Sequence, residues 1–110
     1  MRYASITKTF RFEALDHRGQ CSRLHGHSYR LEVTLRGPIK DAPGESDHGI
    51  VMDFYDLSSI VKNVIVGRLD HQDLNVVTGL YTTTENLVYW MWDELVAYGV
   101  PGALLHRIRL

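Results

Sequence analysis

Alternating apolar and polar residues mark two segments in the first third of the chain. Apolar side chains alternate with polar ones from Ile6 to Ala14, and again, more regularly, from Ser28 to Arg36. A period of two residues puts successive side chains on opposite faces of a β-strand, so both segments are predicted to be strands with one buried face. Gly37-Pro38 ends the second segment, and residues 41–47 have the composition of a loop. The alternation returns in a third predicted strand, Leu105 to Leu110.

Between these strands the apolar period changes to that of a helix. Apolar residues recur at helical spacing from Phe54 to Ile65, with Asp53 placed to cap the start and Gly67 the end. A second helical stripe runs from Leu87 to Val96 and stops before a Gly-Val-Pro sequence. It follows Thr82-Thr83-Thr84-Glu85, which has the pattern of a capping box. The sequence therefore predicts two helices.

The order strand, strand, helix, helix, strand predicts an α+β domain, in which two helices cover one face of an antiparallel sheet. The 110 residues are enough for one such domain and too few for two, so residues 1–110 are interpreted as a single domain. A sheet of three strands leaves open edges, and association with other copies of the chain would cover them. The sequence therefore favours a homo-oligomer.

Composition and charge exclude several classes of protein. Twelve basic and thirteen acidic residues give a net charge of −1, which argues against nucleic acid or an anionic membrane as the main partner. No apolar run is long enough to span a bilayer, and the first residues lack the apolar stretch of a signal peptide. The single cysteine, Cys21, cannot form an intrachain disulfide and is typical of a reducing compartment. These features predict a cytoplasmic domain.

Three of the six histidines lie close together in the sequence: His17, His25 and His27. Residues two apart on a strand point to the same face, so His25 and His27 could both reach one metal ion at about 2.0–2.1 Å. His17, from the end of the preceding strand, would complete a three-histidine site with an open fourth position, the arrangement of catalytic zinc. The alternative is a pair of surface histidines at the start of a strand.

Two further groups could carry chemistry. Cys21 precedes His25 by four residues, in a segment whose composition favours a loop. Its thiol is either a small buried group or, near a bound cation, a thiolate available for proton transfer. Asp70-His71 is either part of an ordinary loop or an acid/base pair in which the carboxylate orients the imidazole, and direct contact of these adjacent side chains requires a turn. Glu85 is explained as a helix cap.

Five motifs follow one another along the chain. They are Phe10-Arg11-Phe12-Glu13-Ala14, the segment from Cys21 to Tyr29 with its His-Gly-His, Gly49-Ile50-Val51-Met52-Asp53-Phe54, Leu69-Asp70-His71 with Leu74-Asn75, and Thr83-Thr84-Glu85-Asn86. In this order they resemble the 6-pyruvoyltetrahydropterin synthase family over nearly the whole chain. A cysteine separated by three residues from His-Gly-His is similar to the bacterial branch, 6-carboxy-5,6,7,8-tetrahydropterin synthase of the queuosine and 7-deazaguanine pathway.

The resemblance implies a tunnelling fold of two strands, two helices and two strands. Members of the family trimerise so that their sheets close into a barrel, and two trimers commonly stack as a hexamer. Such closure removes the open edges of the sheet. We therefore expect an oligomeric barrel, as a trimer or hexamer.

The resemblance also implies a reaction and the residues that carry it. The expected substrate is 7,8-dihydroneopterin triphosphate, and the expected products are 6-carboxy-5,6,7,8-tetrahydropterin, triphosphate and acetaldehyde. Zinc would be held by His17, His25 and His27 between subunits. Cys21 would transfer protons as a thiolate, Asp70 and His71 would relay them, and Thr84 and Glu85 would lie near the pterin pocket. The alternatives are the pyruvoyl-forming reaction and a non-catalytic subunit that binds pterin or zinc.

The sequence departs from the family pattern at three places. The first zinc histidine of the family sits four positions after the second phenylalanine, where this sequence has Asp16, with His17 one residue later. Thr82 replaces the proline that usually precedes the Thr-x-Glu-Asn motif. The pterin-binding glutamate of the family follows the last predicted strand, so we expect the chain as given, to Leu110, to lack this glutamate and the fourth strand.

Overall fold

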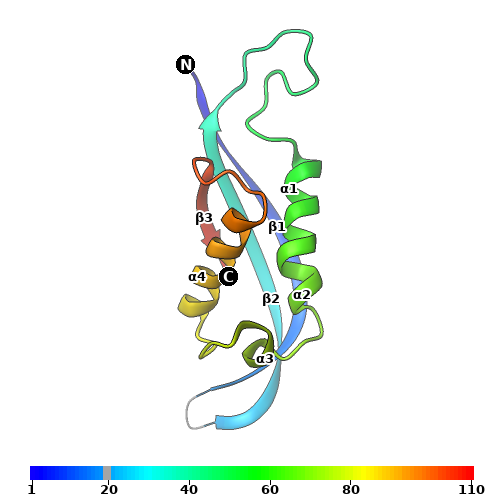
Figure 1. Cartoon of the computed structure of the whole chain (residues 1–110), viewed down its shortest axis with the longest axis vertical. Coiled ribbons are helices and arrows are strands. Elements are labelled where there is room, and N and C mark those ends of the chain that lie inside the picture. Colours follow the sequence, from blue (N-terminus) through cyan, green and yellow to red (C-terminus); the bar gives the residue numbers. More distant parts are fainter. Residues whose placement is uncertain (19–20) are drawn as a thin grey trace.

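Two long antiparallel strands form the body of the sheet. The computed structural model describes residues 1–18 and 21–110, with side chains described except at positions 18 and 21–24. Strand β1 (Tyr3–Arg18) pairs along its length with β2 (Cys21–Pro38), and β3 (Leu105–Arg109) pairs with the second half of β2. The strand order is β1-β2-β3, all antiparallel (Figure 1). The molecule is elongated, 56 × 20 × 20 Å, because β1 and β2 run along most of its length.

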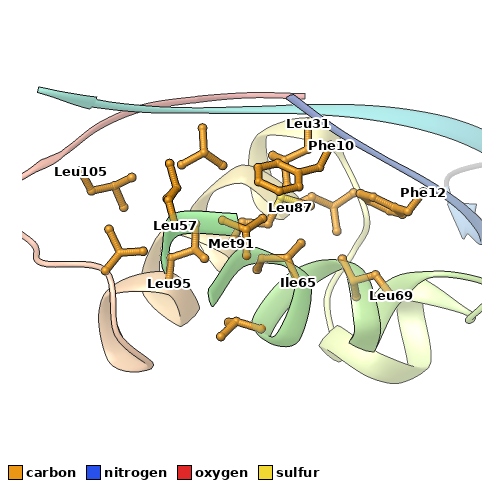
Figure 2. Close-up of a cluster of buried hydrophobic side chains, with 14 of the residues drawn as sticks. Phe10, Phe12, Leu31, Leu57, Ile65, Leu69, Leu87, Met91, Leu95 and Leu105 are labelled. Carbon is orange, nitrogen blue, oxygen red and sulfur yellow. The ribbon is translucent and has the colours of Figure 1, made fainter. Parts of the chain in front are cut away.

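The helices cover one face of this sheet (Figures 1 and 2). The first helical run is continuous and comprises α1 (Phe54–Val61), the π-helical turn η1 (Lys62–Val66) and α2 (Gly67–Leu69). A short helix, α3 (Leu74–Thr78), follows, and then α4 (Thr84–Ala97). Within the described part of the chain, no helix has both the length and the apolar content that crossing a membrane requires.

The hydrophobic core lies between the sheet and the helices. Figure 2 shows Phe10 and Leu31 of the sheet facing Leu57, Met91 and other apolar side chains of the helices, and these residues are buried. Because alternate residues of a strand share a face, the buried positions of β1 recur at every second residue: Phe10, Phe12, Ala14 and Asp16. The last of these carries a carboxylate, which is 2% exposed. A polar side chain therefore occupies the core-facing position directly beyond the apolar core.

The predicted α+β class and the order of strands and helices are confirmed. Both long strands extend further than the alternation of apolar residues predicts. In particular, β2 begins at Cys21, so the prediction of a loop for the described residues of that segment is wrong. The strand continues there because backbone pairing, which is independent of side-chain polarity, runs on to the pair Arg18 and Cys21. The β3 strand lies at the predicted place.

The predicted helix boundaries are partly right. Asp53 caps α1 by accepting a hydrogen bond from the Tyr55 backbone, as expected. Gly67, by contrast, does not end the helix: it is helical, and a Cβ built on it would lie 2.9 Å from the Lys62 carbonyl oxygen. Glycine is therefore suited to the tight approach at the π-helical turn. Asp70 is the residue that ends the helical run.

The start of α4 also differs from the prediction. Its N-cap is Thr83, whose hydroxyl accepts a hydrogen bond from the Asn86 backbone, so the predicted pairing of Thr82 with Glu85 in a capping box is wrong. The hydroxyl of Thr82 is engaged elsewhere, by Asp16. Glu85 lies exposed in the first turn of α4, where its charge is favourable to the helix dipole. The short helix α3 was not predicted, because five residues are too few to establish a helical period.

Candidate functional site

The segment after α2 lies along the outer edge of β1. The Glu13 backbone N–H donates to Oδ1 of Asp70 (2.9 Å), and the Leu15 N–H donates to the Gln72 carbonyl (2.9 Å). These contacts occupy backbone groups of an edge strand that would otherwise remain unpaired. They also fix the turn at Asp70 and His71 against the strand that carries Asp16.

Asp70 and His71 form the contact that an acid/base pair requires. Nδ1 of His71 lies 3.0 Å from Oδ2 of Asp70. The turn that brings these neighbours together puts His71 in the left-handed region, with φ of 58°, which is uncommon for a residue other than glycine. The Glu13 backbone N–H, followed by the His71 imidazole, lowers the pKa of Asp70 below its ordinary value. Asp70 is therefore a carboxylate that orients the exposed His71 ring.

A pocket of about 270 Å³ lies on β1 and β2 beside this turn. It is lined by Glu13, Ala14, Leu15, Gly26, His27, Ser28 and His71. Its walls thus include two of the predicted functional histidines, His27 from β2 and His71 from the segment after α2. The fold brings one predicted metal ligand and one member of the predicted proton relay to the same hollow, although they are far apart in the sequence.

A cluster of polar side chains adjoins this pocket at the core-facing position of β1. Oδ1 of Asp16 lies 2.9 Å from Nε2 of His27, and its Oδ2 accepts a hydrogen bond from the Thr82 hydroxyl at 3.1 Å. The rings of His25 and His27 lie side by side, with centroids 6.4 Å apart, and the rings of His27 and Tyr29 meet in a T-shaped contact with centroids 5.9 Å apart. Asp16 was not predicted as a site residue. The signal that could have found it is its place at the family's histidine position.

The backbone of His17 is held at the same outer edge of β1, by Asn75. Its backbone N–H donates to Oδ1 of Asn75 and its carbonyl accepts from Nδ2 of Asn75, both at 2.9 Å. Its place in the strand is irregular, because the β1–β2 register shifts between Asp16 and Arg18. The role of Asn75 in the motif is thus to hold the end of β1, a function that its sequence position alone did not indicate.

The donor chemistry of the cluster fits a zinc centre, since imidazole nitrogens and carboxylate oxygens are both ordinary zinc ligands. Two donor atoms, Nε2 of His27 and Oδ1 of Asp16, already converge. Among the residues that the structure describes, no three His, Cys, Asp or Glu side chains are gathered closely enough to hold a metal ion as they stand. A bound ion would therefore require a third side chain to turn toward this pair.

The remaining predicted residues lie around the site as follows. Cys21 begins β2 and pairs with Arg18, but its side chain lies outside the described residues. Thr84 and Glu85 lie exposed in the first turn of α4 and do not line the pocket. Thr82, two residues before Thr84, nevertheless ties the start of α4 to Asp16. The catalytic, substrate-binding and metal-binding roles of all these residues stay predictions.

Comparison with known proteins identifies the family. A family model described as 6-pyruvoyl tetrahydropterin synthase matches residues 5–110. The chain belongs to this family. A 6-carboxy-5,6,7,8-tetrahydropterin synthase of Synechocystis is 38% identical over 96% of this chain and 83% of its own length. A 6-pyruvoyl tetrahydrobiopterin synthase of Dictyostelium discoideum is also 38% identical, over 70% of this chain, and the match spans 56% of that relative.

The fold is that of the same family. The structure of Caenorhabditis elegans 6-pyruvoyl tetrahydropterin synthase superposes with a TM-score of 0.82 at 22% identity, covering 98% of this chain and 87% of that one. At this identity the likeness concerns the fold. The enzymes of this family catalyse lyase-type reactions of pterin biosynthesis.

Proposed function

We propose that this protein is a zinc-dependent lyase that converts 7,8-dihydroneopterin triphosphate and water to 6-carboxy-5,6,7,8-tetrahydropterin, triphosphate and acetaldehyde. The proposal assigns it to queuosine and 7-deazaguanine biosynthesis in the cytoplasm. The observation that carries the proposal is the pocket that His27 and His71 both line. His27 is the proposed metal ligand, and His71 is the proposed acid/base residue, whose ring Asp70 orients.

The metal would be held by His25 and His27 with a third donor from the end of β1, which the sequence assigns to His17. When bound, zinc acts as a Lewis acid that makes protons next to a coordinated oxygen more acidic. The protein would then have to hold the substrate side chain across the pocket, between β2 and the turn at Asp70 and His71. A partner subunit in a trimer or hexamer would close this open hollow around the substrate and limit the access of bulk solvent.

The proton transfers are assigned to three side chains. The ionised Asp70 accepts from Nδ1 of His71, which leaves Nε2 of that imidazole able to take up or deliver a proton in the pocket. Cys21, as a thiolate, would remove and return protons at the carbons next to the pterin ring. Thr84 and Glu85 are proposed to contact the pterin from the start of α4.

The carboxy branch is favoured over the pyruvoyl branch by two observations. Three residues separate the cysteine from His-Gly-His, as in the bacterial branch. The match to the Synechocystis carboxytetrahydropterin synthase also spans more of both chains than the match to the Dictyostelium pyruvoyl enzyme. The pyruvoyl-forming reaction remains the second candidate, because the identity to the two relatives is equal.

Mass spectrometry of the products tests the proposal. The zinc-loaded protein is incubated with 7,8-dihydroneopterin triphosphate, beside a His71→Ala variant and a His106→Ala control, whose exposed histidine lies on β3. We expect the carboxytetrahydropterin mass with acetaldehyde from the wild type and the control, and little product from His71→Ala. A 6-pyruvoyltetrahydropterin mass would assign the other branch. Unchanged substrate would favour the non-catalytic subunit that binds pterin or zinc.

A further inference from the structure

We propose that a basic pocket at the outer edge of β1 binds the triphosphate group of the substrate. The pocket has a volume of about 560 Å³. It is lined by Lys8, Thr9, Phe10, Arg11, Arg30, Lys62 and Val66. This inference rests on the proposed function, because it assigns a binding site to the triphosphate that the proposed substrate carries.

The charges around this pocket are all of one sign. Four of its lining residues are lysine or arginine, and the other three carry no charge. The whole chain has a net charge of −1 and twelve basic residues, so a third of its basic residues surround one hollow. Cations gathered in this way attract a ligand with several negative charges, such as a polyphosphate chain.

Arg11 and Arg30 place two like charges side by side in the sheet. They are directly opposite each other on β1 and β2, and like charges at such positions destabilise a sheet. A guanidinium nitrogen of Arg30 lies 3.1 Å from Oε1 of Glu32, so one carboxylate partly neutralises the pair. A phosphate bound between the two guanidinium groups would neutralise the remaining charge, and their planar forks match its oxygens.

Lys8 and Lys62 add two cations from the side of the sheet that the helices cover. Lys8 shares the face of β1 that carries Phe10, and its Nζ lies 5.7 Å from the centroid of the Phe54 ring. Lys62 is exposed in η1. Since Arg11 belongs to the opposite face, cations approach the outer edge of β1 from both faces. A partner strand paired with this edge would use backbone groups in the plane of the sheet and leave these side chains on its faces.

The basic pocket adjoins the pocket of the proposed proton relay. Glu13 and Ser28, which line the relay pocket, are opposite each other on β1 and β2. The pair of Arg11 and Arg30 follows two residues further along the same face, at a distance of about 6.4–6.8 Å. The charge changes sign between these pairs, because the first holds the carboxylate of Glu13, to which the Ser28 hydroxyl donates. A bound substrate would therefore direct its phosphates toward the arginines and its carbon side chain toward the relay.

Binding of inorganic tripolyphosphate, measured by isothermal titration calorimetry, tests the site without using enzyme activity. Zinc-loaded protein is titrated, and the titration is repeated after zinc is removed, because polyphosphates also coordinate zinc. We expect Arg11→Gln and Lys62→Gln each to weaken binding by about tenfold, with or without zinc. Arg36→Gln removes the same charge from the same face of β2 outside the pocket and should bind as the wild type does.

Three outcomes of this titration would overturn the proposal. The first is a wild type that does not bind tripolyphosphate. The second is an equal loss of affinity in Arg11→Gln and in the control Arg36→Gln, which would mean that only the overall charge matters. The third is binding that is the same in every variant and disappears when zinc is removed.

The stability of the free protein separates a ligand site from a structural role. Because Arg11→Gln removes a like charge from its place opposite Arg30, the ligand-free variant should unfold at the temperature of the wild type or above it. Tripolyphosphate should raise the unfolding temperature of the wild type more than that of the variant. A less stable ligand-free variant with unchanged affinity for tripolyphosphate would assign Arg11 to the fold and refute the site.

Steady-state kinetics distinguish failure of the site from failure of the proposed function. With 7,8-dihydroneopterin triphosphate, Arg11→Gln and Lys62→Gln should raise KM by about tenfold, whereas Arg36→Gln should leave it unchanged. If tripolyphosphate binds through these residues but the wild type forms no product, the function is refuted and the site stands. If product forms with the same KM in all three variants, the site is refuted and the function stands.

Discussion

Asn75 exchanges two hydrogen bonds with the backbone of His17, and so takes the place of a neighbouring strand at the outer edge of β1. Its Oδ1 accepts from the His17 N–H and its Nδ2 donates to the His17 carbonyl, both at 2.9 Å. A side-chain amide presents an acceptor oxygen and a donor nitrogen side by side, so that it can pair with the N–H and the C=O of one strand residue, which explains why asparagine suits this position. The contact fixes the end of β1 beside the histidine cluster.

Loss of this amide should destabilise the fold. Asn75→Ala leaves two backbone groups without their partners, and we expect the free energy of unfolding to fall by about 1–3 kcal/mol. Urea denaturation followed by circular dichroism measures the change. Asn63→Ala, in the exposed part of η1, is the matched control and should change stability by less than about 0.5 kcal/mol. Equal effects of the two substitutions would contradict the bridging role of Asn75.

Removal of the thiol tests the proposed role of Cys21. If this thiolate transfers protons, Cys21→Ala should lower kcat at least about a hundredfold. Zinc content and the oligomeric state should stay those of the wild type, because the thiol is proposed neither to bind zinc nor to join subunits. Single-turnover product formation and metal analysis measure the two quantities on the same sample. A fully active variant would remove Cys21 from the mechanism.

The pH dependence of stability should report on Asp70. Its pKa is lowered in the folded protein, so it binds a proton less readily there than in the unfolded chain. Its stabilising contribution is therefore present above the unfolded value, about 3.9, and is lost as pH falls through the lower folded value.

Urea unfolding of wild type and Asp70→Asn between pH 7 and pH 3 measures this contribution. We expect the variant to be less stable at pH 7 and the difference to shrink in acid. A difference that grows as the pH falls would mean that the Glu13 N–H and the His71 imidazole do not favour the charged form of Asp70.

Gly67 offers a test of the π-helical turn. In an ordinary helix, replacing glycine with alanine stabilises by about 1 kcal/mol. Here the new Cβ would lie 2.9 Å from the Lys62 carbonyl oxygen, so Gly67→Ala should destabilise by about 1–3 kcal/mol. Gly102→Ala is the control, because its Cβ would meet only a side chain at 3.6 Å. Thermal unfolding of both variants measures the change in stability that each substitution causes.

The sequence predicted structure correctly where the interacting residues are near one another in the chain. Asp53 caps the helix that its sequence predicts, because the capping bond reaches only two residues ahead. The contact of Asp70 with His71 likewise needed only a turn, which the left-handed backbone of His71 supplies. The predicted capping box at the start of α4 was wrong because the hydroxyl of Thr82 donates a hydrogen bond to Asp16, which lies 66 positions away in the sequence.

The sequence by itself determined the α+β class, the order of the elements, the family and the histidines and carboxylates that could carry chemistry. These follow from the periodicity and spacing of residues that are near one another in the chain. The tertiary structure decided that His27 and His71 line one pocket, that residues 70–75 close the edge of β1, and that Asp16 is buried against His27. Such relations depend on strand register and on the packing of distant segments, which no local pattern encodes.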